Sequence, residues 1–197
     1  MVKKNIGLIL GSFDPVHIGH LALATTAWNT GEFDEIWMVP AFTNIWKSNQ
    51  TSFKHRYNML CQELKDYTSN ITANPFEFTH RDKIIKRAQK GNVGTCHVLD
   101  EIKEQYPNFK FRLIVSTETV HEIPSWIEGE RVMAEWSDMM IIKSIRYIPQ
   151  PFLSPTSTVM IDISSTEIRT MIKNNKTPLP YISSSEYKYI IKNNLYK

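Results

Sequence analysis

The feature that most constrains this chain is an apolar run that ends in a glycine turn and is followed by a helix. Residues 5–10 are nearly all apolar, as expected of a strand that is buried on both faces of a parallel sheet. Gly11 supplies the turn, and apolar residues then recur at helical spacing from Ile18 to Trp28. A buried strand joined to a helix is the unit from which parallel α/β sheets are built.

The same alternation of short apolar runs and helical segments continues along the chain. Further strands are predicted at residues 35–39, 109–116, 138–143 and 157–163, and further helices at residues 53–64, 93–106, from 164 onward and 186–194. The proline-rich residues 148–155 are expected to form a loop. This order predicts an α/β fold, a Rossmann-like doubly wound parallel sheet with right-handed crossovers and a small C-terminal helical region.

Length and composition favour one domain over residues 1–197 and argue against several classes of protein. No run of 18 apolar residues or charged-then-apolar leader occurs, and Cys61 and Cys96 match no disulfide or zinc spacing. A net charge of +3 with a pI near 8.8 is too weak for a dedicated nucleic-acid binder. We expect a cytoplasmic protein with free thiols that handles anionic metabolites, without nucleic acid or membrane as a partner.

The first motif, Gly-Ser-Phe-Asp-Pro-Val-His-Ile-Gly-His, occupies residues 11–20, directly after the first predicted strand. The glycine turn lets a polyphosphate approach the backbone, and the following helix N-terminus attracts anions. His17 and His20 are three residues apart on one helix face, where both imidazoles can bind phosphate oxygens. The pattern favours phosphoryl or nucleotidyl transfer. The alternative is a strand, turn and helix in which the histidines are incidental or form a metal pair.

The second motif, Ile-Ser-Ser-Thr-Glu-Ile-Arg, occupies residues 163–169 and also follows a predicted strand. Its hydroxyl groups can cap a helix or donate to phosphate, and Arg169 adds a fork of donors suited to phosphate oxygens. Alone, the segment is typical of a capped helix. Because both motifs follow strands, a parallel sheet would bring them to the same edge, which strengthens the phosphate interpretation.

Together the two motifs resemble those of the HxGH nucleotidyltransferases, in particular the nicotinate or nicotinamide mononucleotide adenylyltransferases of NAD synthesis. The resemblance extends over nearly the whole chain. Residues 44–47 resemble the family's loop ending in lysine, residues 53–60 its Arg-x-x-Met-Leu helix, Gly94 and Thr95 its Ser-Tyr-Thr turn, Trp126 its pyridine-side tryptophan, and residues 189–196 its closing helix.

The resemblance implies transfer of AMP from ATP to a pyridine mononucleotide, with Mg²⁺ accompanying ATP and no metal ligand from the protein. The implied catalytic residues are His17, His20 and Arg169. The implied ATP-binding residues are Gly11, Ser12, Phe13, His17, His20, Ser116, Glu118, Ser164, Ser165, Thr166 and Arg169. The implied mononucleotide-binding residues are Ser12, Lys47, Arg56, Thr95 and Trp126, although packing is an equal alternative for Trp126.

The chain departs from the family pattern at two places. Residues 115–118 are Val-Ser-Thr-Glu where the family shows Ile-Gly-Ala-Asp, and residues 93–95 lack the tyrosine. These departures leave open how adenine and ribose are held. The oligomeric state, a homo-oligomer included, and the preference between nicotinate and nicotinamide are also open.

Three rival interpretations follow from the same motifs. The acceptor could be phosphopantetheine or a phosphoalcohol, as in related adenylyl- and cytidylyltransferases, or the chain could be a non-catalytic nucleotide sensor. A class I tRNA synthetase shares the His-x-Gly-His pattern, but this chain has no K-M-S-K-S-like loop. Residues 83–90 are basic enough to suggest RNA binding, but a solvated helix face is the favoured interpretation.

Overall fold

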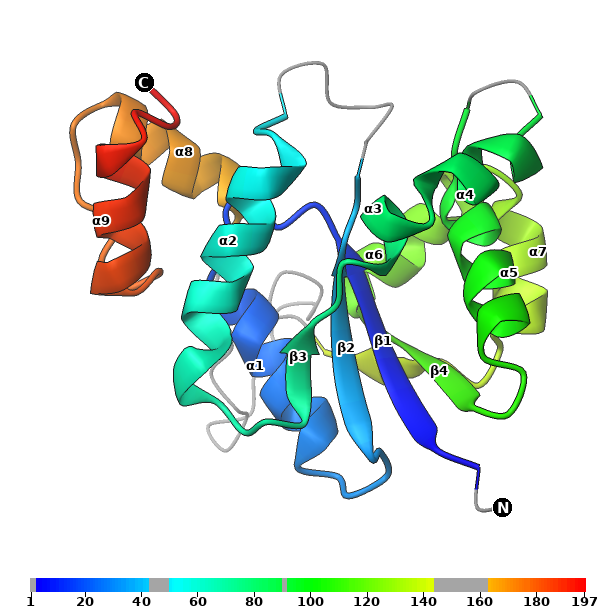
Figure 1. Ribbon diagram of the computed structural model, residues 1–197. Coiled ribbons are helices and arrows are strands. Elements are labelled where there is room, and N and C mark those ends of the chain that lie inside the picture. The colour runs from blue at the N-terminus through cyan, green and yellow to red at the C-terminus, as the bar shows by residue number, and fades with distance from the viewer. Residues whose placement is uncertain (1–2, 43–49, 90–91, 144–162) are drawn as a thin grey trace, which may run out of the picture.

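A five-stranded parallel sheet forms the centre of the protein (Figure 1). The computed structural model describes residues 3–42, 50–89, 92–143 and 163–197. The strands are β1 (Asn5–Gly11), β2 (Glu35–Pro40), β3 (Ile71–Ala73), β4 (Lys110–Ser116) and β5 (Met140–Ile142). Their order is β3-β2-β1-β4-β5. The predicted α/β fold with a parallel sheet is therefore confirmed.

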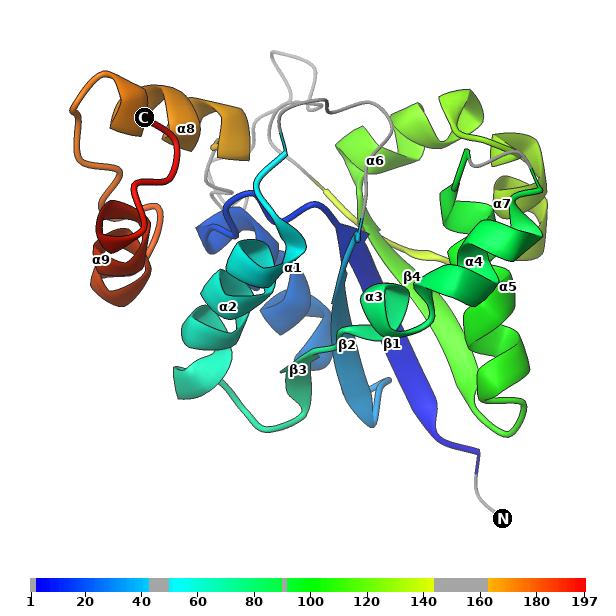
Figure 2. The same ribbon diagram turned by 45° about the horizontal axis from the view of Figure 1, so that its top comes forward.

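Helices cover both faces of this sheet. They are α1 (Ile18–Trp28), α2 (Phe53–Glu63), the 3-10 turn η1 (Leu64–Asp66), α3 (Phe76–Thr79), α4 (Arg81–Arg87), α5 (Thr95–Gln105), α6 (Thr117–Glu122), the 3-10 turn η2 (Ile123–Ser125), α7 (Gly129–Glu135), α8 (Ser165–Lys173) and α9 (Ser184–Lys192). Figures 1 and 2 show α1 and α2, with α8 and α9 beyond them, on one side, and α4, α5 and α7 on the other. No helix among the described residues is both long and apolar enough to cross a membrane.

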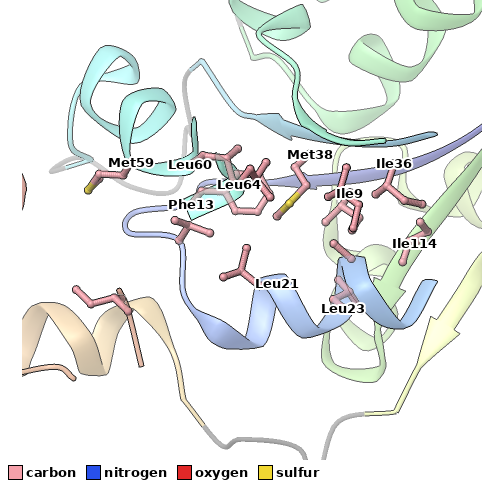
Figure 3. Packing of buried hydrophobic residues seen from close by; sticks show 14 of the residues in the cluster. Ile9, Phe13, Leu21, Leu23, Ile36, Met38, Met59, Leu60, Leu64 and Ile114 are labelled. Atoms are coloured by element: carbon pink, nitrogen blue, oxygen red, sulfur yellow. The ribbon is translucent and has the colours of Figure 1, made fainter. Parts of the chain in front are cut away.

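Two hydrophobic clusters hold the helices to the sheet, one on each face. Successive strand residues point to opposite faces, so Ile9 of β1 joins the cluster under α1 and α2, whereas Leu8 joins the cluster under α5 and α7. Figure 3 shows the first cluster, in which Phe13 and Leu21 lie close to the β1 turn and the start of α1. This packing anchors the turn that carries the first motif.

The strand order creates a switch point between β1 and β4. The chain moves outward from β1 through β2 to β3, then returns to place β4 on the other side of β1. Ligands of such sheets bind beyond the carboxyl ends of the strands at this position. Gly11 ends β1 and Ser116 ends β4, so both lie where the fold predicts a ligand site.

The predicted strands at residues 5–10, 35–39, 109–116 and 138–143 correspond to β1, β2, β4 and β5. Strand β3 was not predicted, because three residues are too few to show a hydrophobic period. The predicted loop at 148–155 and all but the last residue of the predicted strand at 157–163 lie outside the described residues. Cys61 and Cys96 are free thiols, as predicted.

Candidate functional site

The turn after β1 is built around a buried aromatic ring. Phe13 adopts a positive φ of 47°, and its side chain is 1% exposed. Its ring packs edge-on against the ring of His20, with the centroids 5.0 Å apart. A Cβ at Gly11 would lie 3.2 Å from the same ring, which explains the glycine there. The Phe13 side chain therefore packs against the ring of His20. Because that side chain is buried, any direct contact of Phe13 with ATP would have to come from its backbone.

The two histidines are oriented by the start of α1. His17 is the N-cap residue, and its Nδ1 accepts a hydrogen bond from the Gly19 N–H at 3.2 Å. The His17 N–H in turn donates to Nδ1 of His20 at 3.3 Å, and the two ring centroids are 3.8 Å apart. Because each Nδ1 accepts, a neutral ring carries its proton on Nε2. Both histidines are thus oriented as Nε2 donors at a helix N-terminus, a suitable arrangement for phosphate oxygens.

The second motif contacts the first, as the sequence predicted. Ser165 donates from Oγ to the carbonyl oxygen of Pro15 at 2.8 Å, and Arg169 donates from Nη1 to the carbonyl oxygen of Asp14 at 2.7 Å. Both bonds span about 150 residues of sequence. They place the start of α8 against the turn that precedes His17. Imidazole, hydroxyl and guanidinium donors therefore lie in one region at the end of β1.

The hydroxyl groups of the second motif have different structural roles. Ser164 forms a capping box with Glu167: Ser164 Oγ accepts from the Glu167 N–H at 3.2 Å, and the Ser164 N–H donates to Glu167 Oε2 at 2.7 Å. The predicted cap is therefore confirmed. Thr166 Oγ1 accepts from Nη2 of Arg169 at 3.0 Å. Phosphate binding by Ser164, Ser165 and Thr166 stays a prediction.

Arg56 lies inside the protein instead of lining a surface. It is 0% exposed, and its guanidinium donates to the carbonyl oxygens of Thr51 at 2.8 Å, Ser12 at 2.6 Å and Ala41 at 2.5 Å. Burial lowers the pKa of Arg56, and the negative charge of Asp14 opposes this effect. Arg56 therefore holds backbone segments together beside the first motif, and mononucleotide binding by Arg56 stays a prediction.

A buried carboxyl group accompanies this arginine. Glu77 of α3 is 5% exposed, and burial raises its pKa to about 8, with the positive charge of Arg56 acting in the opposite direction. Glu77 was not among the predicted site residues. A glutamate in a short segment without clear periodicity carries no signal of burial.

The start of α5 lies against the segment around Trp126. Gly94 caps α5, and a Cβ there would lie 2.7 Å from Cβ of Ile127, so the two segments touch. The structure thereby brings the neighbours of Thr95 and Trp126 into contact. Trp126 is half-buried against the second hydrophobic cluster. Packing and pyridine stacking therefore both remain open for this ring, and mononucleotide binding by Thr95 and Trp126 stays a prediction.

The departures from the family pattern lie at the end of β4. Ser116 caps α6, and its Oγ accepts from the Thr119 N–H at 3.3 Å. Glu118 follows in the first turn of α6 and is half-buried. Both residues lie at the switch point, and ATP binding by Ser116 and Glu118 stays a prediction. Lys47, the remaining predicted mononucleotide ligand, lies outside the described residues.

Among the described residues, one group of three side chains has metal-ligating atoms within 4.8 Å of one another: Cys96, His97 and Glu128. Nδ1 of His97 accepts from the Gly94 N–H at 3.0 Å, and Glu128 pairs with Nε of Arg131 at 2.9 Å. Burial and the charge of Glu128 raise the pKa of the Cys96 thiol, so without a metal the thiol keeps its proton at neutral pH. His97 supports the start of α5 through its bond to Gly94.

Both the sequence and the fold of this chain are similar to those of known proteins. A family model described as cytidylyltransferase-like matches residues 8–171. A probable nicotinate-nucleotide adenylyltransferase of Flavobacterium johnsoniae is 31% identical over 98% of each chain, and the nicotinate-nucleotide adenylyltransferase of Bacillus subtilis is 26% identical over 98% of this chain and 99% of its own. The structure of Plasmodium falciparum nicotinic acid mononucleotide adenylyltransferase complexed with NaAD matches with a TM-score of 0.75 at 24% identity, over 98% of this chain and 97% of its own.

Proposed function

Because the chain belongs to the nicotinate-nucleotide adenylyltransferase family of cytidylyltransferase-like proteins, we propose that it joins ATP to nicotinate or nicotinamide mononucleotide. The products are the dinucleotide and pyrophosphate, a step of NAD synthesis. One observation carries the proposal beyond family membership: Ser165 and Arg169 bond to the turn that precedes His17, so both phosphate motifs meet at the switch point.

The proposed reaction is an in-line attack of the mononucleotide phosphate on the α-phosphorus of ATP. A bond forms between the attacking oxygen and the α-phosphorus, and the bond to the β-phosphate oxygen breaks to release pyrophosphate. The attacking phosphate is already ionised near pH 7, so neither a protein nucleophile nor a strong base is needed. The protein contributes orientation and charge stabilisation.

Residues of the two motifs supply those contributions. Nε2–H groups of His17 and His20 donate to oxygens of the phosphate chain, where negative charge grows in the transition state. Arg169 holds the β- and γ-phosphates, and Ser165 joins it when its hydroxyl exchanges the bond to the Pro15 carbonyl oxygen for one to a phosphate oxygen. The backbone at Gly11 and Ser12 lies beside the α-phosphate. The hydrogen bonds that preset the rings of His17 and His20 support this assignment.

The acceptor is proposed to lie between the start of α5 and Trp126. The N-terminus of α5 carries a partial positive charge, which suits the carboxylate of nicotinate or the oxygen of its amide. Contact between Gly94 and Ile127 keeps this helix end close to the tryptophan segment and supports the assignment. Thr95 contributes a hydroxyl there, and the ring of Trp126 would cover the pyridine.

A divalent cation accompanies ATP in nucleotidyltransferases of this family, and we propose that it is Mg²⁺. The described residues near the two motifs supply imidazole, hydroxyl and guanidinium groups. The Asp14 carboxylate is already bonded to Tyr196 and Thr51, and the Glu167 carboxylate is bonded to Ser164. These groups do not form a protein cage for Mg²⁺, so ATP phosphates and water are its proposed ligands. When bound, the cation neutralises charge on the departing pyrophosphate.

Pyrophosphate release from ATP with a panel of acceptors tests the function. We expect release with nicotinate or nicotinamide mononucleotide, together with formation of the matching dinucleotide. Release only with phosphopantetheine or a phosphoalcohol would assign a different acceptor to the same fold. ATP binding without release for any acceptor would indicate a nucleotide sensor and contradict the proposal.

A further inference from the structure

The last residues of the chain reach the turn of the first motif. Tyr196 donates from its hydroxyl to Oδ1 of Asp14 at 2.7 Å, across 182 positions of sequence. Asp14 is 3% exposed and lies three positions before His17. The second carboxylate oxygen of Asp14 accepts from the Thr51 N–H at 3.1 Å. This carboxylate therefore ties together the motif turn, the segment before α2 and the C-terminal end.

The route of the chain after α9 explains how Tyr196 reaches Asp14. Asn194 adopts a positive φ of 52°, its N–H donates to the carbonyl oxygen of Ile191, and the Leu195 N–H donates to that of Ile190. This pair of bonds is a Schellman motif, which reverses the chain at a helix end. The reversal directs Leu195 and Tyr196 back onto the first hydrophobic cluster, beside the motif turn.

The environment of Tyr196 keeps its phenol a hydrogen-bond donor. Burial and the negative charge of Asp14 raise the pKa of Tyr196, so the phenol keeps its proton and donates at neutral pH. Arg56 also lies close enough to Asp14 for their charges to interact.

Three separate elements therefore hold the backbone and carboxylate of one short turn. Arg56 of α2 binds the carbonyl oxygen of Ser12, Arg169 of α8 binds that of Asp14, and Tyr196 binds the Asp14 side chain. Arg56 is completely buried, and Arg169 belongs to the second motif. Tyr196 is only partly buried and belongs to neither motif. Its hydroxyl bonds to the side chain of Asp14, which belongs to the turn that leads into His17.

We propose that Tyr196 is a positioning residue for adenylyl transfer: through Asp14 it fixes the turn that presents His17 and His20 to the phosphates. This inference rests on the proposed function. Tyr196 itself does not touch a substrate. A displacement of about 1 Å in catalytic groups is enough to slow a reaction strongly, so the effect falls on turnover and not on overall binding.

Tyr196→Phe removes only the hydroxyl and tests this role. Tyr189→Phe is a matched control, because the Tyr189 hydroxyl bonds to Nδ1 of His55 at 2.9 Å and to Nδ2 of Asn58 at 3.1 Å, between α9 and α2, without touching the motif turn. We expect Tyr196→Phe to lower kcat by about tenfold, equivalent to about 1.4 kcal/mol, with little change in either KM. Tyr189→Phe should leave kcat within about twofold.

Hydrogen exchange of the peptide covering residues 11–20 gives a readout without activity. Tyr196→Phe should speed exchange there, whereas Tyr189→Phe should not. Asp14→Asn provides a second variant at the other end of the bond, because an amide oxygen can replace only one of the two carboxylate acceptors, and it should speed the same exchange. Equal losses of thermal midpoint for the two tyrosine variants, with unchanged kcat and exchange, would show that Tyr196 only anchors the C-terminal end.

Different results would contradict the proposed function and the positioning role of Tyr196. Absence of adenylyl transfer by the wild-type protein would remove the proposed function, and the exchange comparison would still decide whether Tyr196 orders the turn. Normal transfer by the wild-type protein with unchanged turnover in Tyr196→Phe would remove the positioning role alone.

Discussion

Arg169 donates from Nη1 to the carbonyl oxygen of Asp14 at 2.7 Å, and this bond joins the start of α8 to the turn that precedes His17. Its Nη2 donates to Thr166 Oγ1 at 3.0 Å. One guanidinium thus connects two sequence motifs that lie at opposite ends of the chain. Because a planar fork makes both bonds at once, a point charge cannot replace it.

Arg169→Lys should therefore reduce activity although it keeps the positive charge. Lysine cannot bridge Asp14 and Thr166 while also offering paired donors to phosphate oxygens. ATP binding should weaken more than AMP binding, as measured by titration calorimetry of both nucleotides. Equal weakening for ATP and AMP would place Arg169 away from the β- and γ-phosphates and leave it only a structural role.

His20→Ala should lower turnover by about a hundredfold or more, because a donor to the developing charge is lost. His20→Asn is the sharper variant, since its amide oxygen can replace Nδ1 as acceptor for the His17 N–H and keep the helix cap. We expect His20→Asn to retain the thermal midpoint of the wild type and to show a similar loss of kcat. Near-normal turnover in a folded His20→Asn protein would exclude Nε2 of His20 from the reaction.

Trp126→Ala should raise the acceptor KM by about threefold to tenfold and leave the ATP KM unchanged. Stacking on an aromatic ring is worth about 0.5–1.5 kcal/mol beyond burial of area, which corresponds to that range. Trp136→Ala is the matched control, because Trp136 is 3% exposed and its truncation should cost about 3–5 kcal/mol of stability. If Trp126→Ala lowers the thermal midpoint strongly without changing the acceptor KM, Trp126 is a packing residue.

The pair formed by Glu186 and Glu63 predicts a pH dependence of stability. Glu186 is 0% exposed, and burial, with the nearby charge of Glu63, raises its pKa well above the usual range. From about pH 4.3 upward the unfolded chain loses this proton while the folded protein keeps it, so the free energy of unfolding falls as pH rises towards the folded pKa. The fall can reach about 1.4 kcal/mol per pH unit.

Glu186→Gln should remove this dependence. Relative to the wild type, the variant should gain stability progressively between pH 5 and pH 8, as measured by denaturant unfolding at each pH. Glu122→Gln, at an exposed position of α6, is the control and should follow the wild type. A constant difference between Glu186→Gln and the wild type over this pH range would show that Glu186 is ionised in the folded protein.

Short-range chemistry explains which structural predictions were confirmed. The turn after β1, the helix that follows it and the capping box of Ser164 depend on residues within a few positions of one another. Hydrophobic period and capping preference are therefore visible in the sequence. The contact between the two motifs was also predicted, although the strand expected before the second motif lies outside the described residues.

Long-range packing decided the rest. The burial of Arg56 and the bond from Tyr196 to Asp14 depend on which segments fold against the motif turn, and the partners in that bond are 182 positions apart. An arginine in a helix and a tyrosine near a chain end look the same in sequence whether they face solvent or the interior. The sequence by itself determined the two motifs and the α/β fold that unites them, whereas only the tertiary structure decided which side chains hold the motif turn in place, because those contacts form between segments that are not neighbours along the chain.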